Sequence, residues 1–320
     1  MFPRLTIFTA LLMLMNTELT HANTLVIYSS GPGALIDRLV ADFRSETGIN
    51  ANVFQSTTGQ VLARLDSERS NPRADVVISA SWDSAQDLKR QGLLLAYQSP
   101  NAEQVPDFLK DSHYVAQGVA SLAMVWNRNS ETPQPSDWSD VADDVYRNEV
   151  TMPDPSQSGA AFQLVSGLLT ANGDQATWAL LARLSDNGMI VPGPNARALN
   201  PVLQGAKSVV FGAVDYIALG QQADGEAIEV IFPTSGTVIA PRPMMILEST
   251  SNVELAQQFV DFVLSEQGQQ RVAESYLMPV RPDVDGLRPG LKDLNLIDVD
   301  VEEMNARRAE ILTQFRRAME

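Results

Sequence analysis

Strand-like and helix-like patterns alternate along the first part of this chain, and this alternation restricts the fold more than any other feature. The strand-like runs are Thr24–Tyr28, Asn50–Gln55 and Ala74–Ile78. The helical patterns that follow them are Ala34–Thr47, Thr57–Arg69 and Ser84–Gln91. The third strand-like run is almost entirely apolar, as expected for a strand buried on both faces. Repeated strand–helix units predict an α/β fold with a parallel sheet and crossover helices.

Hydroxyl-bearing and small residues follow each of these strands. The segments are Ser29-Ser30-Gly31, Ser56-Thr57-Thr58-Gly59 and Ser79-Ala80-Ser81-Trp82. Ligands of open α/β sheets bind beyond the carboxyl ends of the strands. The candidate ligand-binding residues at this edge are Ser29, Ser30, Gly31, Thr58, Ser79 and Ser81.

The stretch Val150–Phe162 combines a short strand, a proline-containing turn and the start of an apolar helix. Its prolines fix φ and prevent the helix from beginning early. Ser158 and Gly159 then precede the helical pattern Ala160–Leu169. Small residues at such a turn leave backbone N–H groups accessible at the positive end of the helix dipole, where an anion can bind. The alternative is simple capping of the helix by Ser158, and the local sequence does not separate the two.

A second domain is predicted between a strand that leaves the first domain, Val119–Asn127, and a strand that returns to it, Val238–Leu247. Its further elements are the helix Thr177–Asn187, the strand Ser208–Phe211, the loop Gly212–Tyr216 and the strand Glu229–Phe232. The predicted boundaries are a signal peptide at 1–22, a discontinuous lobe 1 at 23–125 plus 241–320, and lobe 2 at 126–240. The tail Asp300–Arg317 has helical spacing, and we expect it to pack as a capping helix.

The start of the chain has the pattern of a secretory signal peptide. Arg4 is followed by the apolar run Leu5–Met15, and Thr20-His21-Ala22 has small residues at the positions of a cleavage site. The apolar run is shorter than the ~20 residues that a membrane-spanning helix needs. We therefore expect export and cleavage near Ala22.

Composition limits the class of partner. The chain of 320 residues has no cysteine, so its stability cannot depend on disulfides, and its length favours two domains. Its formal net charge of −16 argues against nucleic acid and anionic membrane surfaces as partners. A small anion can still bind, because local N–H groups and helix dipoles hold it. We expect a monomer.

The ordered set of motifs resembles the periplasmic solute-binding proteins of ABC importers, type II cluster, in the branch that binds ferric ion, thiamine, 2-aminoethylphosphonate or sugar phosphates. The resemblance is carried by LVIYSSG (Leu25–Gly31), FRSETGI (Phe43–Ile49), ADVVISA (Ala74–Ala80) with GLL (Gly92–Leu94), MPDPSQSGAAF (Met152–Phe162) and AQQFVDFVLSEQGQ (Ala256–Gln269). It implies a two-lobed periplasmic-binding-protein fold of type II, with a hinge and an interlobe ligand cleft. It also implies a periplasmic location and an inner-membrane permease as partner.

The resemblance disfavours ferric iron as the ligand. Ferric-binding members have a His after the YSS segment, a Glu after the ADV strand and two consecutive tyrosines in the second lobe. The corresponding positions here are Gly31-Pro32-Gly33, Ala80 or Ser81, and Asp215-Tyr216. Ferric iron needs several oxygen or imidazole ligands. A ferric-iron-binding protein of the same family is therefore the alternative, and not the main prediction.

A small organophosphorus anion, such as 2-aminoethylphosphonate or a sugar or glycerol phosphate, is the predicted ligand. Hydroxyls, glycines and helix N-termini suit a phosphate or phosphonate group. The resemblance places that group near Ser29, Ser30, Ser158 and Gly159. Ala160 stands where related SGT turns have a threonine, so one hydroxyl donor is missing.

Arg197, Asp215 and Tyr216 complete the candidate ligand-binding residues. Asp215 either pairs with an ammonium or hydroxyl of the ligand or caps the helix that follows it. Arg197 either binds phosphate in a bidentate manner or is a solvated loop arginine. Tyr216 retains one of the two family tyrosines.

The residues do not favour an enzyme. His113 is the one histidine after the predicted cleavage site, and no nucleophile motif lies near it. The sequence contains no GxSxG elbow, no metal-spaced His/Glu cluster and no phosphate-binding Walker loop. We therefore expect a binding protein without catalytic residues, bound metal or cofactor.

Overall fold

The computed structural model describes residues 24–320, so the predicted signal peptide lies outside the described residues. The strands are β1 (Thr24–Ser29), β2 (Asn50–Gln55), β3 (Val76–Ile78), β4 (Tyr114–Asn127), β5 (Val150–Thr151), β6 (Val209–Val214), β7 (Ile228–Ile231) and β8 (Ile239–Ile246). The helices are α1 (Gly33–Thr47), α2 (Thr58–Ser67), α3 (Trp82–Arg90), α4 (Gly159–Asp186), α5 (Asn195–Leu203), α6 (Asp215–Ala223), α7 (Val253–Val263), α8 (Glu266–Glu274), α9 (Val301–Ala306) and α10 (Arg308–Ala318).

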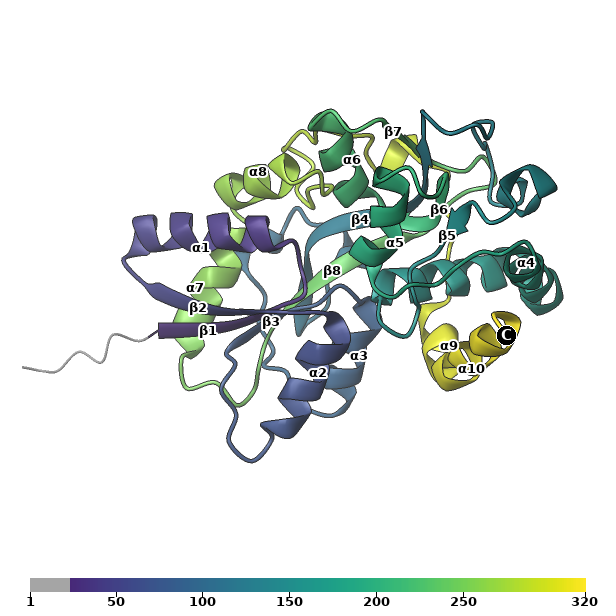
Figure 1. Cartoon of the computed structure of the whole chain (residues 1–320). Coiled ribbons are helices and arrows are strands. Elements are labelled where there is room, and N and C mark those ends of the chain that lie inside the picture. Colours follow the sequence, from purple (N-terminus) through teal and green to yellow (C-terminus); the bar gives the residue numbers. More distant parts are fainter. Residues whose placement is uncertain (1–23) are drawn as a thin grey trace, which may run out of the picture.

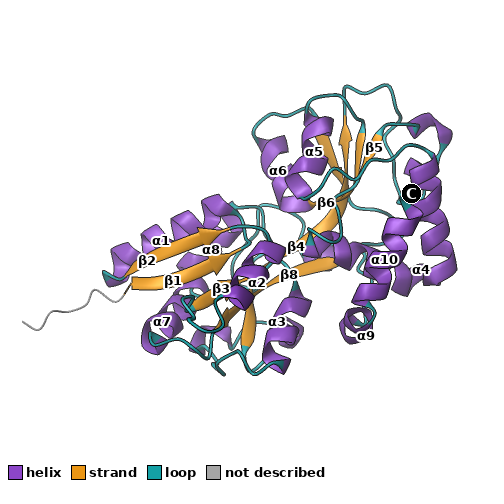
Figure 2. Ribbon diagram, turned by 60° about the horizontal axis from the view of Figure 1, so that its bottom comes forward, coloured by secondary structure: helices purple, strands orange, loops and turns teal. Residues whose placement is uncertain are grey.

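The strands follow one path through the molecule, in the order β2-β1-β3-β8-β4-β6-β5, with β7 paired to β4. β1 pairs in parallel with both β2 and β3, which confirms the parallel sheet predicted from the strand–helix units. β8 lies antiparallel between β3 and β4. We call the half that contains β1–β3 lobe 1 and the half that contains β5–β7 lobe 2; β4 and β8 pass through both halves (Figures 1 and 2). The exact boundary residues between the lobes remain a prediction.

The lobe 1 sheet is buried on both faces because its strand residues alternate between two sets of helices. Ile27 and Ile78 belong to the cluster that includes Phe43 of α1, whereas Val77 packs with residues of α2 and α3. Phe43 contacts Phe259 of α7 edge-on, with ring centroids 5.3 Å apart. This two-sided burial explains why the third predicted strand is so apolar.

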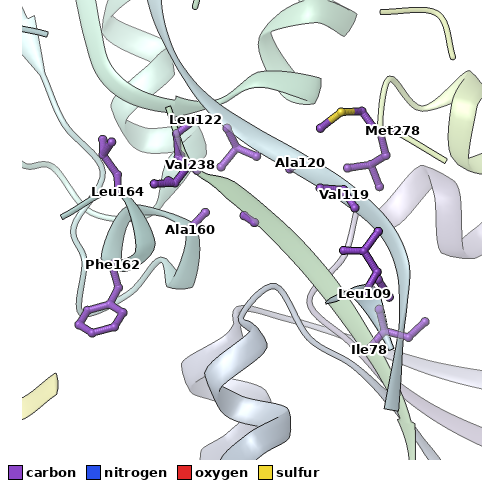
Figure 3. Close-up of a cluster of buried hydrophobic side chains, with 14 of the residues drawn as sticks. Ile78, Leu109, Val119, Ala120, Leu122, Ala160, Phe162, Leu164, Val238 and Met278 are labelled. Carbon is purple, nitrogen blue, oxygen red and sulfur yellow. The ribbon is translucent and has the colours of Figure 1, made fainter. Parts of the chain in front are cut away.

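The hydrophobic core continues from one lobe to the other along β4 and β8. Figure 3 shows Ile78 and Leu109 at the lobe 1 end of this cluster and Leu164 at the other end, with Val119 between them. Both strands are therefore part of the hydrophobic core that the two lobes share. Within residues 24–320, no helix combines the length and apolar character needed to cross a bilayer.

The predicted loop Gly212–Tyr216 is wrong, because β6 continues to Val214 and α6 begins at Asp215. The glycine that suggested a loop has φ 81° within the strand. A Cβ at Gly212 would overlap with Leu164 Cδ2, so the glycine permits close packing of β6 on α4.

Helix predictions in lobe 2 were partly correct. The two predicted helices that begin at Ala160 and Thr177 are parts of α4, separated at Gly173, where the backbone has φ 76°. Helix α5 was missed. Its sequence has Pro194 as N-cap and Pro201 inside the helix, and prolines normally indicate a loop.

The tail forms two helices, α9 and α10, and packs mainly on lobe 2 (Figure 2). Ile311 and Phe315 are buried, and Arg307 pairs with Asp174 of α4 at 2.6 Å. The predicted packing of the tail is confirmed, because α10 lies against α4 and α9 lies against α3 of lobe 1. The assignment of the tail to lobe 1 stays a prediction. Side-chain contacts also join the tail to α3 of lobe 1: Arg308 forms an ion pair with Asp83 at 2.6 Å, and the Asn305 amide donates to Gln86 Oε1 at 3.3 Å.

A buried ion pair attaches the segment before the tail to the start of α6. The side chains of Asp215 and Arg288 are both fully buried and form a salt bridge. The Asp215 carboxylate also accepts a hydrogen bond from the Ser121 amide of β4 at 2.7 Å. Removal of one partner from such a pair leaves an uncompensated buried charge.

Arg288→Ala is therefore expected to lower the free energy of unfolding by about 3–5 kcal/mol, measured by urea denaturation. Adding Asp215→Asn to this variant should recover part of the loss, because the asparagine carries no charge and the buried, unpaired carboxylate is removed. The control is Arg281→Ala, whose partner Asp283 has a side chain that is 46% exposed, and it should cost no more than about 1 kcal/mol. An equal effect of both arginine substitutions would contradict this account.

Candidate functional site

The loops after β1 and β2 meet at Ser30. The Ser30 amide donates to the Ile78 carbonyl at 2.9 Å, and the Thr58 hydroxyl donates to the Ser30 hydroxyl at 3.2 Å. Ser29 is fully buried, and its hydroxyl accepts from the Gly31 amide at 3.1 Å. The structure brings these four predicted residues together, but the Ser29 hydroxyl is already hydrogen-bonded within the loop.

The hydroxyls after β3 are also engaged with one another. The Ser79 hydroxyl accepts from the Ser81 amide at 3.2 Å and from the Ser84 hydroxyl at 2.6 Å. Ser81 is the N-cap of α3, and its hydroxyl donates to Asp83. Ser79 and Ser81 therefore shape the start of α3, and a ligand could use their hydroxyls only by exchanging these partners.

Ser158 caps α4, as one of the two alternatives predicted. Its hydroxyl accepts from the Ala161 amide at 3.1 Å and donates to Asn195 Oδ1 at 2.9 Å. The Ala160 side chain is buried in the hydrophobic core. At the start of α4, the turn therefore offers a ligand the Ser158 hydroxyl and backbone N–H groups at the positive end of a long helix.

The two lobes touch where Gly159 faces Ser81. A Cβ built on Gly159 would lie 2.5 Å from Ser81 Cβ. A cavity of about 80 Å³ opens beside this contact, and both lobes contribute hydroxyl and amide side chains to it. Its neutral polar lining residues include Thr58, Ser84, Ser156 and Gln157, and its charged ones are Arg308, Asp83 and Asp87, with Asp83 paired to Arg308. The predicted turn and the predicted strand ends therefore face each other across the junction.

Neither Asp215 nor Arg197 is among the residues that line the cavity at this junction. Asp215 is fully buried, and its carboxylate is already paired with Arg288 and Ser121. Burial raises the pKa of the Asp215 carboxyl, and the guanidinium of Arg288 opposes that rise. Asp215 is the first residue of α6 and not its N-cap, although its Oδ1 accepts from the Tyr216 amide at 2.6 Å in the first turn. Arg197 is exposed on α5 rather than in a loop.

Sequence reasoning missed the most informative side chain, Arg242 of β8. It is only 2% exposed, and its Nε has no hydrogen-bond partner among the described residues. Its Nη1 donates to the Ser30 carbonyl at 3.4 Å, and its guanidinium lies 4.9 Å from the centre of the Tyr216 ring. Among residues 24–320, no carboxylate lies within ion-pair distance of Arg242. The signal in the sequence was an arginine between two prolines in a strand that is otherwise apolar.

A second unpartnered polar atom lies in the same region. Gln117 is 1% exposed, and its Oε1 accepts no hydrogen bond from the described residues. A Cβ built on Gly31 would lie 3.7 Å from this oxygen, so Gln117 faces the loop after β1. An unsatisfied donor and an unsatisfied acceptor therefore occur close to the Ser30–Gly31 loop, where burial without partners is costly.

These groups can hold an anion. In the part of the chain that the structure describes, no group of three or more His, Asp or Glu side chains is placed to hold a metal ion. A guanidinium, several N–H groups and hydroxyls are instead the donors that a phosphate or phosphonate oxygen accepts from.

Comparison with known proteins assigns the chain to a family. Residues 71–305 match the sequence profile of bacterial extracellular solute-binding proteins. The chain belongs to this family. Members are substrate-binding components of ABC importers, which implies a small-molecule ligand and a permease partner. Relatives of the chain are periplasmic transport proteins, in agreement with the predicted periplasmic location and with the expectation of a binding protein.

Individual relatives differ in ligand. A putative 2-aminoethylphosphonate-binding periplasmic protein of Salmonella typhimurium is 24% identical over 76% of this chain and 73% of its own length. Iron uptake protein A1 of a Synechocystis species is 26% identical over 79% of this chain and 75% of its own length. The periplasmic binding protein AfuA of Actinobacillus pleuropneumoniae, solved with bound fructose-6-phosphate, superposes with a TM-score of 0.84 at 22% identity, over 93% of this chain and 99% of that one. The structural likeness confirms the two-lobed α/β fold.

Gly159→Ala is expected to separate the lobes, because the added methyl group would overlap with Ser81. Small-angle X-ray scattering should show a larger radius of gyration than in the wild-type protein. Gly33→Ala is the matched control, since a Cβ there meets nothing within 4 Å. Identical scattering from both variants would mean that the Gly159–Ser81 contact does not set the distance between the lobes.

Proposed function

We propose that this solute-binding protein captures a small organophosphorus anion, either an aminophosphonate or a sugar or glycerol phosphate, and delivers it to the permease of an ABC importer. The observation that carries the proposal is Arg242, a buried guanidinium without a carboxylate partner. The ligand would bind where the Ser30 loop, Tyr216 and Arg242 meet the turn at Ser158.

A buried, unpaired arginine is unfavourable in the free protein. Transfer of a charged group out of water costs several kcal/mol unless a counter-charge and hydrogen bonds replace the lost hydration. A phosphate or phosphonate oxygen can supply both, and the planar guanidinium can bind it with two parallel hydrogen bonds. The free energy that Arg242 costs in the empty protein is therefore recovered when an anion binds.

The remaining groups suit the rest of such a ligand. Gln117 Oε1 can accept a hydrogen bond from an ammonium or a hydroxyl group, which is the role that the sequence assigned to Asp215. Ser30, Thr58 and Ser158 supply neutral hydroxyls, and Gly159 and Ala160 supply backbone N–H groups at the start of α4. This division places the anionic end beside Arg242 and the polar organic end beside Gln117.

Ligand capture would proceed by closure of the lobes about β4 and β8. The ligand stabilises the closed state only to the extent that it contacts both lobes at once. Ser30 and Ser81 belong to lobe 1, whereas Ser158 and Tyr216 belong to lobe 2, so a bound anion would bridge them. The exported mature chain would begin after Ala22 and act as a monomer.

Ferric iron is the second candidate, because one relative is an iron uptake protein. Two features of this chain argue against it. Only one tyrosine, Tyr216, occupies the position of the family's tyrosine pair, and the Arg242 guanidinium lies 4.9 Å from its ring centre. A fixed positive charge at that distance repels a trivalent cation.

A thermal-shift and calorimetry screen distinguishes these ligands. The compounds are 2-aminoethylphosphonate, glycerol 3-phosphate, glucose 6-phosphate, inorganic phosphate, thiamine and ferric citrate. An organophosphorus compound is expected to raise the melting temperature, with a stabilisation of about 2.7 kcal/mol at a hundred times its Kd. A response to ferric citrate alone, with a visible tyrosinate charge-transfer band, would replace the anion proposal by the iron alternative.

Arg242→Gln tests the role of the buried guanidinium. Affinity for the organophosphorus ligand should fall about tenfold to hundredfold, because a hydrogen bond to a charged group is worth ~1.5–3 kcal/mol. The melting temperature of the free variant should not fall, because an unpaired buried charge has been removed. Arg44→Gln, an exposed arginine on α1, is the control and should change neither quantity. Unchanged affinity of Arg242→Gln would place the anion elsewhere.

A further inference from the structure

A second cavity lies on the opposite side of β8 from Arg242. Its volume is about 330 Å³, and Ile239 and Pro241 form part of its wall. Successive residues of a strand point to opposite faces, so Arg242 faces away from the side that Ile239 and Pro241 face. The cavity therefore lies on the other face of β8 from Arg242, and it shares the lining residue Asp83 with the cavity at the Gly159–Ser81 contact.

Three parts of the chain enclose this cavity. Lobe 1 contributes Trp82 at the start of α3, lobe 2 contributes Phe162 of α4, and the tail contributes Val299 and Met304. The lining is predominantly apolar. Two of the exposed large hydrophobic side chains of the described residues, Phe108 at 59% and Leu296 at 39%, also line it.

One polar side chain in the lining lacks a partner. Ser166 of α4 is 2% exposed, lines the cavity, and its hydroxyl makes no hydrogen bond with the described residues. A buried hydroxyl left unsatisfied costs ~1–3 kcal/mol. A serine normally avoids this cost in a helix by bonding to a backbone carbonyl, so a free hydroxyl in an apolar cavity points to a missing partner.

The charges around the cavity disfavour an anion. Asp83 and Asp298 are the ionisable residues in its lining. Asp83 is already paired with Arg308 at 2.6 Å. These carboxylates disfavour an anion, and the predominantly apolar lining favours an uncharged occupant, in contrast to the ligand of the anion site.

We propose that this cavity is a second binding site, for a small neutral apolar molecule with one hydroxyl group that pairs with Ser166. A cavity of about 150 Å³ lined by apolar side chains binds benzene, so a site of about 330 Å³ has room for a two-ring compound. Because Trp82 and Phe162 belong to different lobes, an occupant also links the lobes at this point. The proposal does not depend on the identity of the ligand in the anion site.

The test uses 2-naphthol, naphthalene and naphthalene-2-sulfonate as probes with the full mature chain, measured by isothermal titration calorimetry and by ligand-observed NMR. 2-Naphthol should bind more tightly than naphthalene by about tenfold, and the sulfonate should not bind at this site. No binding of 2-naphthol up to its solubility limit, or tighter binding of the sulfonate than of 2-naphthol, would overturn the proposal.

Two variants locate the binding. Ser166→Ala should remove the preference for 2-naphthol over naphthalene, and it should leave the melting temperature unchanged or higher, because an unsatisfied hydroxyl is lost. Val299→Phe should fill the cavity and lower the affinity for both compounds at least tenfold. Ser45→Ala, which removes an exposed hydroxyl on α1 away from the cavity, is the matched control and should leave binding of both compounds unchanged. Wild-type affinity of Val299→Phe for the probes would show that they bind elsewhere. The organophosphorus screen is an independent result in either case.

Discussion

The pairing of β4 with β8 is the constraint on which the rest of the structure depends. These strands are joined from Tyr114 and Met245 at one end to Ser121 and Ile239 at the other, and they carry the core from lobe 1 into lobe 2. Their backbone hydrogen bonds fix the face to which each side chain of β8 points. One strand can therefore present a guanidinium on one side and an apolar wall on the other.

The buried charged side chains of this molecule differ in whether another described residue neutralises them. Asp215 and Arg288 are buried together and neutralise each other, so they stabilise the join between α6 and the segment before the tail. Arg242 is buried without such a partner. A chain with a net charge of −16 has many carboxylates, yet none of those in residues 24–320 lies within ion-pair distance of Arg242. That local excess of positive charge is what an anionic ligand can complement.

Several parts of the fold and the site could be predicted because they depend on neighbours in the sequence. The strand–helix units, the cap at Ser158 and the hydroxyl-rich strand ends all follow from local patterns, and the structure contains them. Predictions failed where distant residues decide the outcome. Gly212 indicated a loop, but it is a strand residue that makes room for Leu164.

The sequence by itself determined the order of the elements and the hydroxyl-rich, glycine-rich character of the strand ends, because hydrophobic periodicity and capping act over a few residues. Only the tertiary structure decided which charges meet. Asp215 was a candidate for the ligand until Arg288, far along the chain, was found to pair with it. Arg242 could not be distinguished from a surface arginine until its burial and its lack of a carboxylate were known. Whether a polar group is satisfied depends on contacts between distant segments, and those contacts exist only in the folded chain.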